Sequence, residues 1–425
     1  MFSSRLPPSF AANRISRAVD AARAVRPLYD LTETNPTAVG LVYPAAAILA
    51  ALADPRALAY EPTAEGLLAA RRAVADYYRR CHARAVDPAR ITLTASTSEA
   101  YAWLLKLLCD PGDDILVPQP SYPLFDHLAA LEGVRLVPYP VRYHGGWFID
   151  ADEVRRAIGP RTRAVVVVNP NNPTGSFLTR QEAAALWQLA AAHELAVISD
   201  EVFADYGYAP DPARATTLVD DDDATATATT ATTTTTATTT TATTTTTATM
   251  ATTTATSTAP ALTFCLSGLS KPAGLPQLKL GWIVSGGPPA LRAAAEERLH
   301  LIADTYLSVA TPVQLAAPAL LALVDDVGAQ IRDRARANRA TLAAAFADGS
   351  AAQLYRADGG WSAVIRLPAT RTEEEWTLAL VERGVVVHPG FFFELPPTSI
   401  VVSLLVAPAT LAAALPALLA LVDGG

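Results

Sequence analysis

A continuous run of small and β-branched residues, AVVVV at residues 164–168, constrains the fold more than any other segment of the chain. A strand without polar alternation offers no face to water, so this run predicts a strand buried on both sides, as in a parallel sheet. Similar runs, expected as strands, alternate with helical stretches at 98–109 and 181–194; these strands lie at 114–117, 134–137, 196–199, 262–266 and 280–284. The alternation predicts an α/β fold with a mainly parallel sheet.

The pattern changes near residue 306. A long Ala/Leu/Arg helix is expected at 327–346, followed by short strands at 362–367, 385–388 and 400–405. We therefore expect a large domain at residues 59–305 and a small α+β domain at 306–425, with the N-terminal segment 1–58 packing with the small domain.

Residues 224–259 are all alanine or threonine except Met250 and Ser257, and four aspartates precede them. The tract has no apolar periodicity and nothing to bury, so we expect a disordered surface insert in the large domain. Long surface loops add little entropic cost, so the segments on either side can remain neighbours in the fold.

Composition excludes several classes of protein. The chain carries 41 acidic and 33 basic residues, a net charge of −8, without the basic stripe that a nucleic-acid binder needs. The first residues lack the apolar centre of a signal peptide, and no apolar stretch is long enough to span a bilayer. We expect a soluble cytoplasmic protein. Three widely spaced cysteines fit neither a disulfide framework nor a metal site, so free thiols and no metal are expected.

Lysine is rare: only Lys106, Lys271 and Lys279 occur. Any chemistry that requires an amine nucleophile has these three candidates. Lys271 follows an expected strand and lies among small residues, with Ser270 before it, which leaves room for a cofactor. Lys106 lies within a helix among leucines, where a surface role is typical. Lys279, eight residues after Lys271, could reach a phosphate.

An acid and a phosphate cradle are also present. Asp200 ends an apolar strand, where its carboxylate either faces a charged ring nitrogen or caps the next helix. Ser96, Thr97 and Ser98 stand between a strand and a helix, where backbone N–H groups and the helix dipole hold phosphates. The alternative is a plain capping motif with Glu99 in the first turn.

Two further residues could fix a flat ring. Tyr122, in PSYP, could stack on it, and Asn172, in NPNNPTG, could hydrogen-bond to its phenolic oxygen, although NPTG alone is also a good turn. Lysine, acid, phosphate cradle and ring contacts are together the parts that pyridoxal 5'-phosphate (PLP) needs.

The ordered set of motifs resembles the class I and II aminotransferases of PLP fold type I. These motifs are a TSEA helix start, PSYP, NPNNPTG, SDEVF and GLSKPAGLPQLKLGW, and the resemblance runs from about Thr32 to Leu405. It implies the type I fold, a large PLP domain with a smaller α+β domain, and transfer of an amino group from an L-amino acid to a 2-oxo acid.

The resemblance also implies roles. Lys271 looks like the lysine that forms the Schiff base and moves the substrate proton, and Asp200 like the partner of the pyridine nitrogen. The other implied cofactor contacts are Asn172 on O3', Tyr122 on the ring, and Ser96, Thr97, Ser270 and Lys279 on the phosphate. Tyr60 resembles the tyrosine that reaches the phosphate of a neighbouring subunit, which implies a homodimer with shared active sites. Gly40 resembles the backbone that approaches the substrate.

Three positions depart from the family pattern. Phe203 replaces a tyrosine, and Lys279 replaces an arginine on the phosphate. The C-terminal strand reads IVVSLL, with Val401 at or beside the position of an arginine for the substrate carboxylate, and no Arg or Lys follows Arg383. Either another cation takes over, or backbone groups and hydroxyls hold the carboxylate, or the substrate lacks one there. We favour a substitute arginine, and the candidates are Arg5, Arg14, Arg356 and Arg366.

Because the arginine is missing and the fold does not determine the reaction, a second function is possible: a PLP-dependent lyase or decarboxylase on the same fold. A PLP-dependent regulator is a third, but such proteins carry an added DNA-binding domain for which the motifs leave no room. The sequence does not name the amino donor.

Overall fold

A computed structural model describes residues 2–7, 9–222, 259–346 and 349–423. The Ala/Thr insert, apart from Ala259, lies outside these residues, so its expected disorder is not addressed. Within the described part of the chain no single helix is long and apolar enough to cross a membrane. The pair formed by α10 (Thr311–Ala322) and α11 (Val327–Ala345) reaches that length only together, across a bend of 54°.

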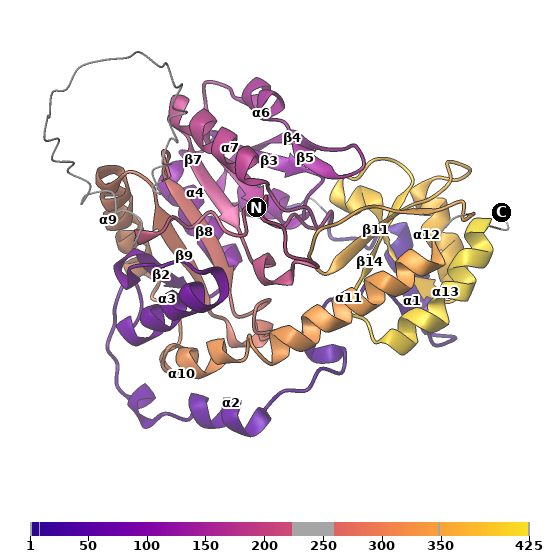
Figure 1. The fold of residues 1–425 in the computed structure, drawn as a ribbon, viewed down its shortest axis with the longest axis horizontal. Coiled ribbons are helices and arrows are strands. Elements are labelled where there is room, and N and C mark those ends of the chain that lie inside the picture. Colours follow the sequence, from indigo (N-terminus) through magenta and orange to yellow (C-terminus); the bar gives the residue numbers. More distant parts are fainter. Residues whose placement is uncertain (1, 8, 223–258, 347–348, 424–425) are drawn as a thin grey trace, which may run out of the picture.

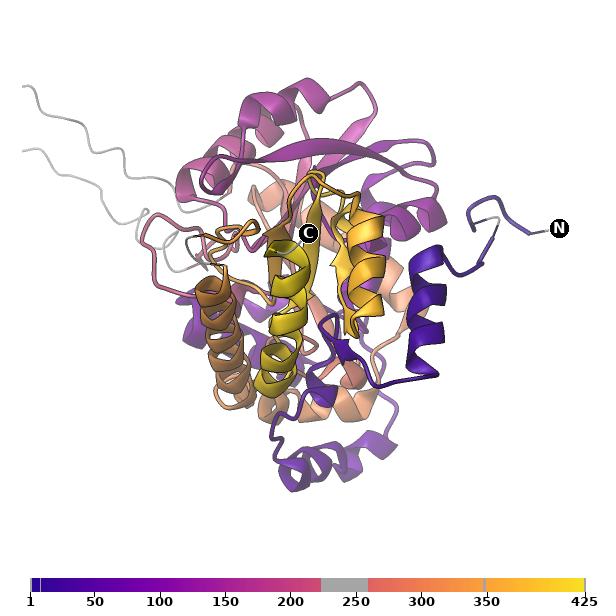
Figure 2. The ribbon, with the colours of Figure 1, turned by 90° about the vertical axis from the view of Figure 1, so that its right-hand side faces the viewer.

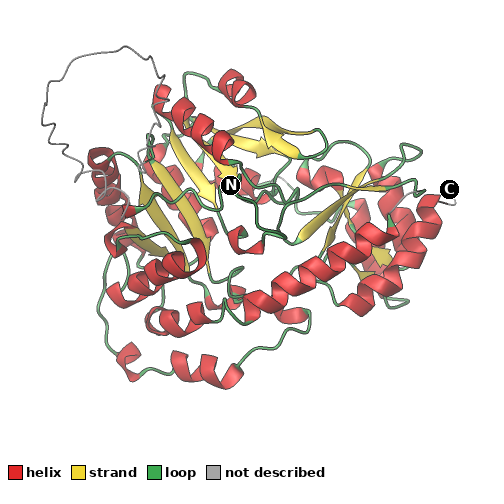
Figure 3. Ribbon diagram, in the orientation of Figure 1, coloured by secondary structure: helices red, strands yellow, loops and turns green. Residues whose placement is uncertain are grey.

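An eight-stranded sheet forms the centre of the larger unit (Figures 1 and 3). Its order is β2-β9-β8-β7-β6-β3-β4-β5, and the five strands from β8 to β4 are parallel. The strands are β2 (Ile91–Thr94), β3 (Asp114–Gln119), β4 (Arg135–Tyr143), β5 (Trp147–Ile149), β6 (Thr162–Val168), β7 (Ala196–Asp200), β8 (Thr263–Gly268) and β9 (Gly281–Gly286). The mainly parallel α/β sheet is confirmed.

Alternate residues of β6 face two different cores. Val165 and Val167 belong to one apolar cluster, and Val166 and Val168 to another. Successive strand side chains point to opposite faces, so the unbroken valine run is buried on both. Helices cover each face: α4 (Thr97–Leu108), α5 (Leu124–Glu132) and α9 (Pro289–Tyr306) on one, and α3 (Leu68–His82), α6 (Ala151–Ala157), α7 (Arg180–Ala192) and α10 on the other.

The smaller unit is built on a four-stranded antiparallel sheet of order β10-β11-β14-β13. Its elements are β10 (Gln353–Leu354), β11 (Ser362–Arg366), β13 (His388–Pro389), β14 (Ser399–Ser403), α11, α12 (Glu373–Glu382) and α13 (Pro408–Asp423). Figure 2 shows α11, α13, α12 and the N-terminal α1 (Arg14–Arg23) side by side over this sheet, and each contacts the next. The expected strand at 385–388 is instead two short strands, because β12 (Val385–Val386) pairs with β1 (Tyr29–Asp30) rather than with β14.

The N-terminal segment contacts both units. Helix α1 lies on α12 and β1 pairs with β12, whereas α2 (Ala45–Leu52) packs on α10. Helix α10 falls within the expected small domain, yet it packs on α3 and its buried leucines belong to a core of the large unit. The chain passes from one unit to the other between α10 and α11 (Figure 1).

Candidate active site

A cavity of about 470 Å³ lies between the two units. Three parallel strands, β6, β7 and β8, end at this cavity. Their last residues all line it: Val168, Asp200 and Gly268. Ligands of open α/β sheets bind beyond the carboxyl ends of strands. The opposite wall comes from the small sheet and its neighbours, through Thr32, Thr34, Trp361, Ser362, His388, Phe392, Phe393, Val401, Val402 and Ser403.

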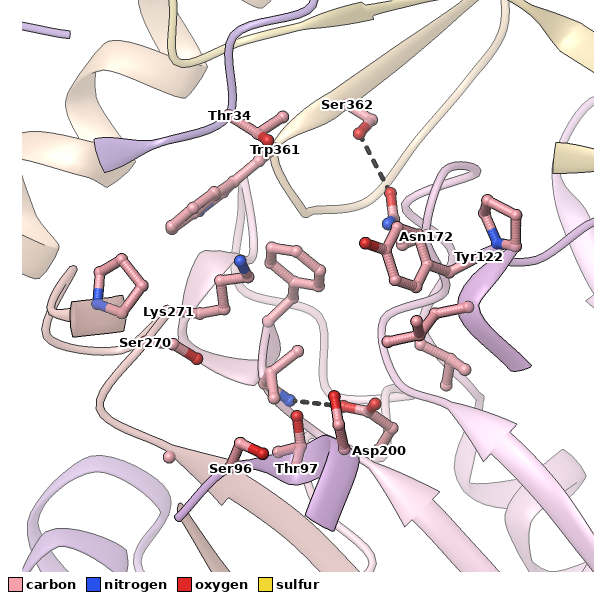
Figure 4. Close-up of a pocket in the computed structure, with 18 of the residues that line it drawn as sticks. Thr34, Ser96, Thr97, Tyr122, Asn172, Asp200, Ser270, Lys271, Trp361 and Ser362 are labelled. Atoms are coloured by element: carbon pink, nitrogen blue, oxygen red, sulfur yellow. Dashed lines mark hydrogen bonds between the residues drawn. The ribbon is translucent and has the colours of Figure 1, made fainter. Parts of the chain in front are cut away.

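Lys271 lies in the turn after β8, and its amine enters this cavity (Figure 4). Its Nζ is 5.9 Å from the ring centre of Phe203 and 5.4 Å from that of Trp361. Burial lowers the pKa of the Lys271 amine, and the charge of Asp200 opposes this shift. A lowered pKa increases the neutral fraction, which is the nucleophilic form. The Tyr206 hydroxyl donates to the Lys271 carbonyl oxygen at 2.6 Å and so holds the turn in place.

Asp200 ends β7 at the base of the cavity (Figure 4). Its Oδ1 accepts a hydrogen bond from the Val202 N–H at 3.2 Å, and its Oδ2 accepts one from the Tyr101 hydroxyl at 3.2 Å. Burial raises the pKa of this carboxyl to about 6, although both hydrogen bonds act against the shift. Asp200 does not cap the next helical turn, because that turn is Ala204–Tyr206 and its N-cap position is Phe203, with no side-chain cap.

Hydroxyl groups and a helix N-terminus gather beside Asp200. Ser96, Thr97 and Ser270 lie at one end of the cavity, where α4 begins, and Lys279 lines the same cavity (Figure 4). The Ser96 Oγ does cap α4, accepting from the Glu99 N–H at 3.1 Å. The Thr97 and Ser270 hydroxyls have no hydrogen-bond partner among the described residues, and the α4 N-terminus adds partial positive charge. This motif therefore caps the helix and also offers hydroxyl and backbone donors at this end of the cavity, an arrangement that suits a phosphate.

The two ring-contact candidates lie on a third side of the cavity (Figure 4). Tyr122 is 47% exposed. Asn172 follows β6, and its Oδ1 accepts a hydrogen bond from the Ser362 hydroxyl at 3.1 Å. That bond joins the large unit to β11 directly across the cavity.

The structure does not bring Tyr60 or Gly40 to the cavity. Tyr60 is 79% exposed and borders a separate hollow of about 180 Å³ with Trp103 and Ser308. Gly40 is exposed, has φ +73°, and has open space where a side chain would be. Thr32 and Thr34, from the same segment, line the cavity in its place.

The proposed substitute arginines are all outside the cavity, which corrects that expectation. Arg5 and Arg14 are exposed on the N-terminal arm, and Arg366 points outward from β11. Arg356 is 67% exposed and pairs with Asp358 at 3.7 Å. Among the residues that the structure describes, the basic groups lining the cavity are Lys271, Lys279 and His388.

Sequence reasoning missed several residues of the site. Tyr101 had a usable signal, because it lies one helical turn after Thr97 and so on the same face of α4. Trp361, Ser362 and His388 had none, since their place in the cavity follows from how the small sheet docks on the large one. The described residues contain no cluster of three metal-ligating side chains, and the three cysteines are free.

The comparisons with known proteins agree with this geometry. The sequence profile of the family "Aminotransferase class I and II" matches residues 30–418. The arginine–pyruvate transaminase AruH of Pseudomonas aeruginosa is 28% identical over 77% of this chain and 73% of its own length. The glutamate–pyruvate aminotransferase AlaA of Escherichia coli is also 28% identical, over 59% of this chain and 53% of its own.

Solved structures extend the likeness to the whole chain. The N-succinyldiaminopimelate aminotransferase of Mycobacterium tuberculosis superposes with a TM-score of 0.74 at 27% identity, covering 99% of this chain and 100% of that one. An alanine aminotransferase from Pyrococcus furiosus gives a TM-score of 0.80 at 21% identity, with both chains fully covered, a likeness of fold. With a profile match over most of its length, the chain belongs to the class I and II aminotransferases, which are PLP enzymes of fold type I.

Proposed function

We propose that this aminotransferase binds PLP with its phosphate at the Ser96–Thr97–Ser270 end of the cavity and its reactive carbon beside the Lys271 amine. The observation that carries the proposal is the placement of Lys271 and Asp200 in one cavity at the carboxyl ends of adjacent strands. Asp200 is a half-buried carboxylate whose raised pKa marks the absence of a full counter-charge, which a protonated pyridine nitrogen supplies. Unpartnered hydroxyls and a helix N-terminus fit the phosphate.

When bound, the cofactor supplies a carbonyl carbon that condenses with amino groups and a protonated ring that withdraws electrons from the adjoining carbon. The chain's residues divide the remaining work. Lys271 holds the cofactor and then moves a proton between the substrate Cα and the cofactor C4' atom, for which its lowered pKa suits it. Asp200 keeps the pyridine nitrogen protonated, Asn172 and Tyr122 fix the ring, and Lys279 adds charge at the phosphate.

The test is chemical labelling followed by a donor screen. Purified protein with PLP should absorb in the visible, and borohydride reduction should fix the cofactor on the peptide that contains Lys271. A label on Lys106 or Lys279 would contradict the assignment. L-Arginine and L-glutamate with pyruvate as acceptor, and L-alanine with 2-oxoglutarate as acceptor, are the first substrates to try, because two relatives carry pyruvate in their names.

A second candidate function rests on the apolar residue at Val401. Without an arginine there, a lyase or decarboxylase on the same fold remains the alternative. Product analysis separates the two reactions. Transamination needs the oxo acid for repeated turnover and returns a new amino acid, whereas the alternative releases an amine or an eliminated group without any acceptor.

We also propose a cytoplasmic homodimer with shared active sites. Large apolar side chains are exposed on α2, on the segment that follows it and on α9: Leu49, Leu58, Tyr60, Leu301 and Tyr306. Exposed large apolar side chains of this kind support the proposal of an interface. Light scattering should give the mass of two chains. If it does, Tyr60→Phe should weaken PLP binding by roughly tenfold, the worth of one hydrogen bond to a charged group; a monomer with full activity would contradict the proposal.

A further inference from the structure

The wall of the cavity contributed by the small sheet contains a single ionisable side chain among the described residues, His388. Around it are Trp361, Phe392, Phe393 and Val401. The two lysines of the cavity belong to the opposite wall, Lys271 after β8 and Lys279 shortly before β9. The substrates of an aminotransferase are amino and oxo acids, so a carboxylate must lie in this cavity beside the reacting carbon. A buried carboxylate without a hydrogen-bonding cation is costly.

The strand register places His388 beside Val401. The two residues are direct partners in the antiparallel pair β13–β14. Directly opposed residues of such a pair project from the same face of the sheet. Val401 lines the cavity, and the imidazole of His388 lines it with Val401.

The imidazole has spare hydrogen-bonding capacity. Neither ring nitrogen has a hydrogen-bond partner within the described ranges, and the residue is half-buried. Its neighbours are aromatic: the ring centres of Phe392 and Phe393 are 6.1 and 5.8 Å away. These rings orient the imidazole without using its nitrogens, which remain free to donate to a ligand.

Elimination leaves the same residue. Under the proposed function Lys271 serves the reacting carbon and Lys279 the phosphate, and the four candidate arginines lie outside the cavity, so His388 is the basic group that remains. We propose that His388 on β13, in its protonated form, binds the substrate carboxylate. An arginine at position 401 of the neighbouring strand β14 would have the same role. This inference rests on the proposed function and names the group that selects acid substrates at that site.

The charges around His388 determine its pH dependence. Burial lowers the pKa of His388, and Asp30 of β1 opposes this shift. Asp30 is itself paired with Arg23 of α1, and Glu373 of α12 accepts hydrogen bonds from the Phe391 and Ser399 N–H groups. A bound carboxylate adds negative charge and favours the protonated ring. Carboxylate affinity should therefore be highest at low pH and fall as the pH rises through the pKa of His388.

The experiment uses the PLP-loaded enzyme and two unreactive probes, hydrocinnamate and its amide, hydrocinnamamide. They have one shape but differ in charge, and neither has an amino group that reacts with the cofactor. Dissociation constants are measured by calorimetry at pH about 6 and about 8.5, on either side of an ordinary histidine pKa. The variants are His388→Phe, the double variant His388→Phe with Val401→Arg, and His144→Phe, which removes an exposed histidine from the β4–β5 turn.

The wild type and His144→Phe should bind the acid better than the amide, and better at the lower pH. His388→Phe should bind the acid roughly 10- to 100-fold more weakly, the range for a hydrogen bond to a charged group, and leave the amide unchanged. In the double variant, arginine should restore acid binding without the pH dependence, because arginine stays charged.

Unchanged acid affinity in His388→Phe, or a pH dependence that survives it, would overturn the inference alone. A wild type that binds no PLP would overturn the proposed function with it, and its absorbance reveals this before any probe is added. If His388→Phe fails to fold, His388→Gln takes its place, since glutamine still donates a hydrogen bond but does not titrate. It should lose the pH dependence and keep part of the acid affinity.

Discussion

The two walls of the cavity differ in chemistry. The wall from the large unit carries the charged groups Asp200, Lys271 and Lys279, a helix N-terminus and several hydroxyl residues beside its apolar ones. The wall from the small unit is mostly aromatic and apolar, with Trp361, Phe393 and Val401, and its ionisable member within the described chain is His388. Under the proposed function the difference separates two tasks: the first wall holds the cofactor, which the whole family shares, and the second faces the substrate, which varies between members.

A change on the polar wall should have the largest effect. Asp200→Asn keeps the shape and an oxygen that accepts from the Val202 N–H, and its amide N–H can donate to the Tyr101 hydroxyl oxygen, but it removes the charge. We expect turnover to fall by roughly 100-fold or more, as when a charge partner is removed from a reacting centre. Steady-state rates with saturating PLP measure this. Turnover near that of the wild type would remove Asp200 from the catalytic machinery.

The same variant should stabilise the protein without cofactor. The pKa of Asp200 is about 6 in the fold against 3.8 when unperturbed, so the folded state binds more protons between these values. Stability therefore falls as pH rises from about 4 to 6, and above pH 6 the ionised carboxylate costs about 3 kcal/mol. Urea unfolding of apo Asp200→Asn should show this gain at pH about 8 and lose it at pH about 3.5.

The wall from the large unit could be predicted from the sequence, whereas the wall from the small unit could not. The valine run of β6, the Lys271 turn and the order of motifs are local signals, so the α/β sheet and the cofactor wall could be predicted. The β12–β1 pairing and the place of His388 depend on residues more than 300 positions apart or on the docking of two sheets. Hydrophobic periodicity carries no information on such contacts. The position of the four candidate arginines outside the cavity could not be predicted either, because sequence gives no measure of where side chains point.

A smaller effect on the polar wall is expected at Tyr101. Its hydroxyl bonds to Asp200 and lowers the pKa of that carboxyl. Tyr101→Phe removes the bond, so the pKa of Asp200 should rise further and PLP binding at neutral pH should weaken by about tenfold. Absorbance titration with PLP between pH about 5.5 and 8 tests both changes.

Tyr139→Phe is the matched control, because the Tyr139 hydroxyl is equally buried but donates to the Val166 carbonyl oxygen at 2.7 Å, away from the cavity. It should lose stability and keep PLP affinity. Equal effects of the two variants would show that Tyr101 contributes only to folding.

Phe203 lies where the two walls of the cavity meet, and its substitution should change the pH dependence of the bound cofactor. Its ring packs edge-to-face on Trp361 at 5.3 Å and lies near Lys271. Phe203→Tyr adds a hydroxyl that can donate to the phenolic oxygen of the cofactor and stabilise its unprotonated form. The pH at which the absorbance of the bound cofactor changes should fall by about one unit, the equivalent of a typical hydrogen bond. A rise, or no change, would show that the new hydroxyl bonds elsewhere.

The smallest effect should come from the arginines outside the cavity. Arg356 is exposed and pairs with Asp358, and Arg366 points outward on β11. Exposed ion pairs contribute about 0–1 kcal/mol, and a charge outside the cavity cannot give directional contact to a carboxylate within it. Arg356→Met and Arg366→Met should therefore change KM for an amino donor, and the affinity for hydrocinnamate, by less than about twofold. A selective loss of acid binding in either variant, with amide binding intact, would show that the small unit moves on binding and brings an arginine in. In that case the apolar wall described here would belong to an open form of the enzyme, and the contrast between the two walls would hold only before the substrate binds.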